Sequence, residues 1–217
     1  MRETIRARFP QHGVLGEELG ESPGDGTPLR WILDPIDGTA WFTMGAPLFG
    51  TLIALAEGDE PILGVIHFPA LGETVYAARG LGCWFQLEGA AATRVHAAPA
   101  VPIEGAVASA SGVHASDFQR DPSRPAHRLS ALVRSVRKFK FCADCFQHAL
   151  VSRGGLHIAV DTVMAPWDIA ALVPCVEEAG GMVSSLSGQR AGVINGGSLL
   201  TTCHPSVHEA ALALLRA

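Results

Sequence analysis

The sequence predicts an α/β protein built from stacked layers of helices and sheets, and three observations predict this class. Its first half carries apolar strands separated by short polar turns, which favours an antiparallel sheet. Its second half alternates strands with helices. At 217 residues, 48% of them hydrophobic, the chain can bury a sizeable core. We interpret residues 1–217 as a single domain, with an antiparallel-sheet half over about 1–105 and an alternating half over about 106–217.

The first half is predicted to begin with a helix and to continue as strands. Residues 3–9 form the last turns of a helix that Pro10 ends. Residues 13–16 form a short strand, residues 21–28 have the composition of a solvent loop, and residues 30–36 form a buried strand. The strands expected after it, joined by tight turns, are residues 48–56, 62–68, 74–78 and 83–87.

Residues 89–102, which are rich in small residues and proline, are expected to connect the two halves. Glycine pairs predict where two of the later helices end, and Pro205 fits the first turn of the last one. The strands expected in this half are residues 106–111, 136–141, 156–160 and 199–203. The helices expected between and after them are residues 125–133, 145–153, 169–179 and 205–215.

Composition excludes several classes of function. A net charge of −5 argues against a nucleic-acid-binding protein, which normally carries a basic face. No apolar run approaches the ~20 residues needed to span a bilayer, and charges interrupt residues 1–9, where a secretion signal would be apolar. We therefore expect a cytoplasmic protein without a membrane or nucleic-acid partner. Its five cysteines, including the pair Cys142 and Cys145, are expected to be reduced structural thiols.

The centre of the candidate site is a strand that ends in two carboxylates, Asp34 and Asp37, with Pro35 between them. Gly38 and Thr39 follow, at a point where a helix or turn would begin with free N–H groups. Carboxylates at a strand end favour a hard cation, and exposed N–H groups favour an anion. A phosphate group bridged to the protein by Mg²⁺ would satisfy both.

Further acidic residues stand at the ends of predicted elements, and each has an ordinary alternative explanation. Glu17 and Glu18 follow a short strand and could be a solvated pair. Asp168 precedes an apolar helix and could be its N-cap. The segment from Asp34 to Thr39 could by itself be a turn. The three motifs together are much more specific than any one of them.

Taken together, the motifs resemble the inositol monophosphatase superfamily over essentially the whole chain. The matching motifs are Gly16-Glu17-Glu18, Asp34-Pro35-Ile36-Asp37-Gly38-Thr39, and Trp167-Asp168-Ile169-Ala170-Ala171 with Glu178-Ala179-Gly180-Gly181. Residues 45–55, 144–146 and 170–174 resemble the histidinol-phosphatase branch in particular. The resemblance implies the layered α-β-α-β-α sandwich of the inositol monophosphatase type.

The resemblance also implies a role for individual residues around two or three Mg²⁺ ions. The implied metal ligands are Glu17, Asp34, the carbonyl of Ile36, Asp37 and Asp168. The implied catalytic residues are Glu17, Asp37 and Thr39, with the Thr39 hydroxyl near the attacking water. The implied substrate-binding residues are Gly38, Thr39, Asp144, Asp161 and Asp168, of which Gly38 and Thr39 hold the phosphate through their backbone N–H groups.

These roles predict Mg²⁺-dependent hydrolysis of a small phosphomonoester, a reaction that needs up to ~10²¹-fold acceleration. Two carboxylates, Asp144 and Asp161, suit a cationic substrate, which favours L-histidinol phosphate, a metabolite of histidine biosynthesis. One alternative is hydrolysis of an inositol phosphate or another sugar phosphate. A second alternative is a truncated, non-catalytic domain that binds metal and phosphate.

The resemblance implies a long helix and a hairpin before residues 3–9, including an aspartate that pairs with Thr39 to orient the water. We therefore expect an N-terminally truncated domain that lacks these elements. Loss of such a general base typically lowers the rate ~10²–10⁴-fold, so the chain either works without that group or is inactive. Uncovered apolar surface would favour a homodimer.

Two further pairs of residues have ordinary interpretations. His204 and His208 are spaced i, i+4 at the start of the last helix and could bind a metal, but we interpret them as a solvated face. Trp41 and Phe42 follow the central motif and are interpreted as core residues rather than a binding platform.

Overall fold

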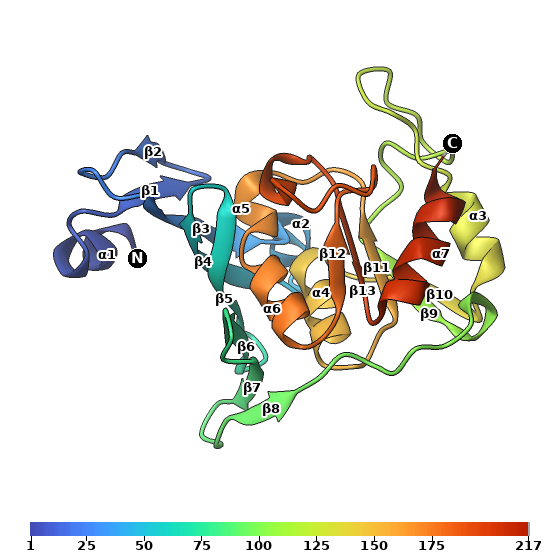
Figure 1. Cartoon of the computed structure of the whole chain (residues 1–217), viewed down its shortest axis with the longest axis horizontal. Coiled ribbons are helices and arrows are strands. Elements are labelled where there is room, and N and C mark those ends of the chain that lie inside the picture. The colour runs from blue at the N-terminus through green and yellow to red at the C-terminus, as the bar shows by residue number, and fades with distance from the viewer. Residues whose placement is uncertain (217) are drawn as a thin grey trace.

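The computed structural model describes residues 1–216 and shows four main layers (Figure 1). An eight-stranded sheet packs against α4 (Asp144–Ser152) and α6 (Leu172–Glu178), which cover one face of a five-stranded sheet. Helices α3 (Leu129–Ser135) and α7 (Pro205–Leu215) cover the other face of the five-stranded sheet. Helix α1 (Arg2–Arg8) lies at the far end of the molecule and buries none of its residues. The predicted layered α/β class is confirmed.

The eight-stranded sheet has the order β2-β1-β3-β4-β5-β6-β7-β8, and its neighbouring strands are antiparallel except for β1 and β3. Burial alternates residue by residue along β4, as a strand with one face on the core requires. The three-residue strands β2 and β8 were not predicted, because so short a segment shows no alternation of its own. The strands are β1 (Gly13–Gly16), β2 (Gly20–Ser22), β3 (Leu29–Asp37), β4 (Gly50–Glu57), β5 (Glu60–Phe68), β6 (Glu73–Ala78), β7 (Cys83–Leu87) and β8 (Thr93–Val95).

The five-stranded sheet has the order β10-β9-β11-β13-β12. Its first three strands are parallel, as the alternation of strands and helices predicts, and β13 pairs antiparallel with both β11 and β12. Strand β12 has three residues and was not predicted. The strands are β9 (Val107–Ala110), β10 (Lys138–Phe141), β11 (Ile158–Asp161), β12 (Met182–Ser184) and β13 (Leu199–Thr202).

The main core lies between the two sheets, where α4 and α6 fill the space. Phe68 and Leu52 of the first sheet and Leu172 of α6 are fully buried there. The approach of β5 to α6 is so close that a Cβ at Gly64 would lie 2.1 Å from the carbonyl oxygen of Ala171. Only glycine fits at that position of the strand without moving the helix.

The single helix predicted over residues 169–179 is wrong, because two helices stand there. Helix α5 (Pro166–Ile169) ends before Ala170, and α6 begins at Leu172. Pro174 explains the break, since it lacks an N–H group and its ring would clash with the carbonyl of Ala170 in a continuous helix. The helix predicted over residues 125–133 also starts later, at Leu129.

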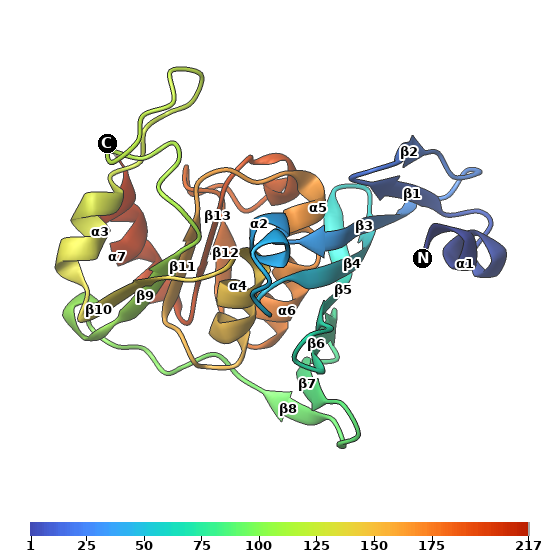
Figure 2. The same ribbon diagram turned by 180° about the vertical axis from the view of Figure 1, so that it is seen from behind.

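Helices α2 (Thr39–Thr43), α4 and α5 gather around the end of β3 on the inner side of the first sheet (Figure 2). This arrangement brings the central motif next to two segments from the second half of the chain. Within residues 1–216, no helix is long and apolar enough to cross a membrane. All five cysteines are free thiols.

Candidate active site

The local geometry of β3 turns Asp34 and Asp37 towards the same site. Residues three apart in a regular strand point to opposite faces of the sheet. Here Asp34 pairs with Leu52 and Asp37 with Gly50, so β3 contains one more residue than β4 between these pairs. This bulge places both carboxylates on one side, as the extra residue reverses the alternation. Pro35, which has no N–H group to lose, lies in the bulge.

Asp168 of α5 completes a cluster with Asp34 and Asp37. One carboxylate oxygen from each of the three residues lies within 4.8 Å of the others. Asp168 is the third residue of α5 and not its N-cap, and it accepts a 2.7 Å hydrogen bond from the N–H of Ala165. That bond fixes the carboxylate while an oxygen still faces the other two. The structure therefore brings together three of the predicted metal ligands.

Burial and mutual repulsion raise the pKa values of these carboxyl groups. Burial, with Glu17 and Asp168 nearby, raises the pKa of Asp34 to about 8. Burial also raises the pKa of Asp37 well above its ordinary value, although the Cys145 N–H donates to it at 2.8 Å. The pKa of Asp168 rises to about 6, mainly through burial. Such a site is unfavourable as three bare anions, and a hard divalent cation fits its all-oxygen donor set.

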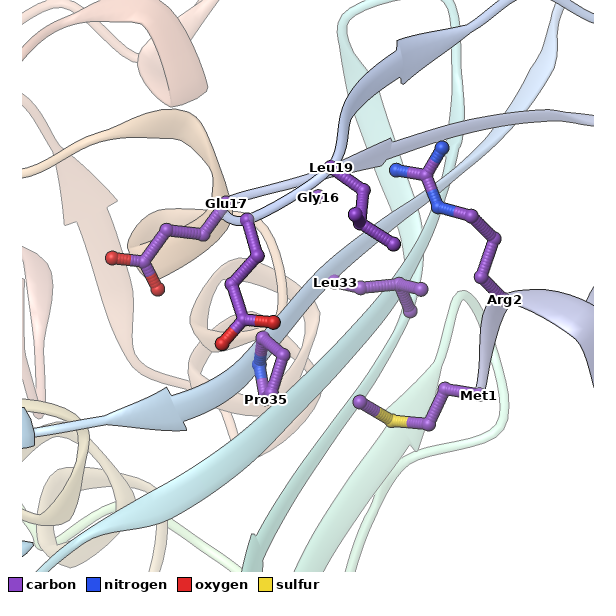
Figure 3. A pocket seen from close by; sticks show the side chains of 8 residues that line it. Met1, Arg2, Gly16, Glu17, Leu19, Leu33 and Pro35 are labelled. Carbon is purple, nitrogen blue, oxygen red and sulfur yellow. The ribbon is translucent and has the colours of Figure 1, made fainter.

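Glu17 follows β1 and lies next to this cluster. At this distance its charge contributes to the raised pKa values of Asp34 and Asp168. It is more exposed than the three aspartates and also lines a shallow pocket with Leu33 and Pro35. Figure 3 shows Met1 on the opposite side of that pocket. Glu17 is thus at the open edge of the cluster, where solvent can reach it.

Ile36, Gly38 and Thr39 form the turn from β3 into α2. Gly38 adopts a left-handed conformation with φ of 80°, which glycine accepts readily. The Thr39 hydroxyl donates a 3.1 Å hydrogen bond to the carbonyl of Ile36. A Cβ at Gly38 would lie 3.0 Å from Oδ2 of Asp144, so the turn passes very close to the start of α4.

Asp144 and Asp161 line one cavity together with Asp37 and Asp168. Its volume is about 430 Å³, within the usual range for small-molecule sites. Burial, with Asp161 nearby, raises the pKa of Asp144 to about 6. The predicted substrate residues therefore lie beside the metal-ligand candidates, although they come from α4 and β11.

Sequence reasoning missed the apolar and polar residues that complete this cavity. Trp41 lines it and Phe42 is 47% exposed, so the interpretation of these two residues as core was wrong. None of the residues of α2 is buried, and no pattern in the sequence indicates this exposure. The remaining lining residues that were not predicted are Ala40, Met44, Ser111, Gly112, His114, Val163 and Met164.

The two histidines of α7 do not share a solvated face. His204 is exposed and caps the helix, accepting a hydrogen bond from the N–H of Ser206. His208 is buried and hydrogen-bonds Ser184 and Thr202, so for this residue the interpretation was wrong. Burial lowers the pKa of His208 to about 4. A buried histidine that makes two hydrogen bonds at this position has a structural role.

The fold agrees with comparisons to known proteins. The model of the inositol monophosphatase family matches residues 1–217. The chain belongs to the inositol monophosphatase family. Relatives in this family are phosphatases that act on small phosphorylated metabolites, so the chain is a phosphoric monoester hydrolase of this type.

Several relatives in the family are histidinol-phosphatases. That of Chlorobaculum parvum is 40% identical over 205 residues, which are 93% of this chain and 73% of the relative. That of Mycobacterium tuberculosis is 37% identical over 217 residues, which are 100% of this chain and 80% of the relative. The solved structure of a Thermotoga maritima IMPase is 30% identical in sequence and superposes with a TM-score of 0.81. The match covers 98% of this chain and 77% of the Thermotoga maritima chain. The resemblance to the histidinol-phosphatase branch is confirmed.

Proposed function

We propose that this phosphatase hydrolyses L-histidinol phosphate to L-histidinol and phosphate, a step of histidine biosynthesis. The observation that carries the proposal is the second acidic pair, Asp144 and Asp161, in the same cavity as Asp37 and Asp168. The ammonium group of histidinol phosphate is attracted by two nearby carboxylates, whereas a neutral polyol gains less from them. Identity of 37–40% to two histidinol-phosphatases supports this substrate.

We propose Mg²⁺, as two or three ions, as the metal. The ligands would be Glu17, Asp34, Asp37, Asp168 and the carbonyl of Ile36. These are all oxygen donors, which Mg²⁺ prefers over nitrogen and sulfur. When bound, Mg²⁺ lowers the pKa of a coordinated water and neutralises phosphate charge.

The chain itself would orient the phosphate and the attacking water. Gly38 and Thr39 can donate their N–H groups to the phosphate at the turn into α2. Because the Thr39 hydroxyl donates its proton to the carbonyl of Ile36, its oxygen is left as an acceptor for the attacking water. Glu17 can accept a proton at the exposed edge of the cluster, and Asp37 is held in place by the N–H of Cys145.

The imidazole ring of the substrate would contact the apolar part of the cavity. Trp41, Met44, Val163 and Met164 line it on the side of α2 and of the loop after β11. Val163 is 43% exposed and Met44 69% exposed, so a planar ring bound there would cover apolar surface that is now in water. A phosphorylated polyol has no such ring to place.

The test is phosphate release from L-histidinol phosphate and from inositol 1-phosphate, each with Mg²⁺ and with excess EDTA. We expect a higher kcat/KM for L-histidinol phosphate and no turnover in EDTA. Replacing Asp161 by Asn should reduce this preference, whereas Asp25→Asn, an exposed surface change, should not alter it. Equal or inverted rates for the two substrates would overturn the proposal.

The second candidate is hydrolysis of an inositol or other sugar phosphate, which the structural likeness to the Thermotoga maritima IMPase favours. The same assay decides between the two substrates. Full Mg²⁺ binding without turnover of either substrate would instead indicate a domain that only binds metal and phosphate. We further propose that residues 1–217 act as one domain and that the protein is a cytoplasmic homodimer, which light scattering and cell fractionation would test.

A further inference from the structure

Asp161 is held by three side chains. None of them belongs to the cluster of Asp34, Asp37 and Asp168 or to the turn from β3 into α2. It is 4% exposed at the end of β11 and lines the substrate cavity. Its Oδ2 lies 2.8 Å from Nε2 of Gln147 and 2.8 Å from Nε2 of His148, both on α4. Its Oδ1 accepts a hydrogen bond from the Ser111 hydroxyl, just after β9. Side chains from α4 and from the end of β9 thus converge on one carboxylate of β11.

Gln147 can act only as a donor to Asp161. Its Nε2 also donates to the carbonyl of Val160 at 3.2 Å, so both hydrogens of the amide are used. Turning the amide over would place its oxygen against two acceptors. Within residues 1–216, Oε1 of Gln147 is one of the buried polar atoms without a hydrogen-bond partner. An unpaired buried oxygen is unfavourable, but the two hydrogen bonds donated by Nε2 outweigh this cost. They therefore decide the orientation of the amide.

His148 is fully buried and links Asp161 to the second sheet. Its Nδ1 lies 2.8 Å from the Thr201 hydroxyl of β13, which is also fully buried. Both contacts are satisfied when Nε2–H donates to Asp161 and Nδ1 accepts from the Thr201 hydroxyl. The imidazole cannot rotate without losing both hydrogen bonds.

The four lone-pair positions of the Asp161 carboxylate are therefore unequally used. Two donors, Gln147 and His148, occupy Oδ2, and one donor, Ser111, occupies Oδ1. A carboxylate has about four acceptor positions, so one remains on Oδ1.

We infer that Gln147, His148 and Ser111 are positioning residues for substrate selection. They hold the Asp161 carboxylate in one orientation, with a single acceptor position left for the ammonium group of an amino-alcohol phosphomonoester. This inference rests on the proposed function and adds to it the residues that fix the preference for a cation. None of the three has to touch the phosphate or the reacting water.

The test compares Gln147→Met and His148→Phe with the wild-type protein on L-histidinol phosphate and on inositol 1-phosphate. Hydrogen bonds to charged groups contribute enough that kcat/KM for L-histidinol phosphate should fall about 10-fold or more, mainly through KM. For inositol 1-phosphate it should change less than about twofold. In an Asp161→Asn background, Gln147→Met should have little further effect. Calorimetry should show matching weaker binding of L-histidinol to the metal-free variants.

The matched control is His208→Phe, which removes another buried, doubly hydrogen-bonded histidine outside the cavity and should leave the substrate preference unchanged. If the α4 variants do not fold, Ser111→Ala removes a donor at a partly exposed position and should raise KM selectively for L-histidinol phosphate. If the wild type prefers L-histidinol phosphate but the variants lower kcat/KM equally for both substrates, the positioning role alone would be overturned. A wild type without that preference would overturn the proposed function.

Discussion

Replacing Asp34 by Asn should stabilise the metal-free protein and remove its response to Mg²⁺. Asp34 is 2% exposed, and its Oδ1 accepts the N–H of Ile36 at 2.9 Å, a contact that an amide oxygen preserves. Two unit charges 4.8 Å apart, the limiting separation in this cluster, repel by about 3 kcal/mol at an effective dielectric constant of about 20. The variant removes the group on which one of these charges would form, and with it one potential metal ligand.

The magnitude follows from the pKa of Asp34, which is about 8 in the folded protein against an ordinary value of 3.8. Because the folded pKa is the higher one, stability is greatest below pH 3.8 and is lost as the pH rises towards 8. At pH 7 the ceiling of this loss is about 4 kcal/mol. Since solvent screens part of the site, we expect about half of it, or an increase in Tm of roughly 4–8 °C for Asp34→Asn.

Mg²⁺ should reverse the order of stability. At 100 times its Kd, Mg²⁺ stabilises the wild type by about 2.7 kcal/mol, whereas the variant should gain little. Differential scanning fluorimetry in EDTA and in Mg²⁺ at pH 7.5 measures both effects, with Asp25→Asn as an exposed control. A variant that has a lower Tm than the wild type in EDTA, yet keeps the full increase in Tm with Mg²⁺, would refute the reasoning. Asp34 would then neither repel the other carboxylates nor bind the cation.

Three further changes test the turn, the buried histidine and the core. Gly38→Ala should lower activity, because φ of 80° is unfavourable for alanine by about 1–2 kcal/mol and the new Cβ would lie 3.0 Å from Asp144; unchanged steady-state kinetics would contradict this. His208, with its pKa lowered to about 4, should contribute stability above pH 6.5 that is lost as the pH falls towards 4, by up to about 3 kcal/mol. Urea midpoints at pH 7.5 and 4.5 should therefore differ less in His208→Gln than in the wild type. Gly64→Ala should destabilise the fold by about 1–3 kcal/mol or more through its clash with Ala171, and an unchanged urea midpoint would contradict the packing.

Local chemistry explains why much of the fold could be predicted from the sequence. Proline, glycine pairs and polar turns mark where elements end, and most predicted strands stand within a few residues of their expected bounds. The break between α5 and α6 was missed, even though Pro174 carries its cause, because the apolar pattern continues across it. The three-residue strands were missed because tertiary pairing forms them.

The sequence by itself predicted the chemistry of the candidate site, since Asp34, Asp37 and Asp168 stand in motifs that favour a cation and a phosphate. Only the tertiary structure decided which side chains meet. The bulge opposite β4 turns Asp34 and Asp37 to one side, and α5 carries Asp168 to them. The holding of Asp161 by Gln147 and His148 depends likewise on α4 packing between two sheets. The physical reason is that spacing fixes the face of an element, whereas burial and contact depend on segments distant in the chain.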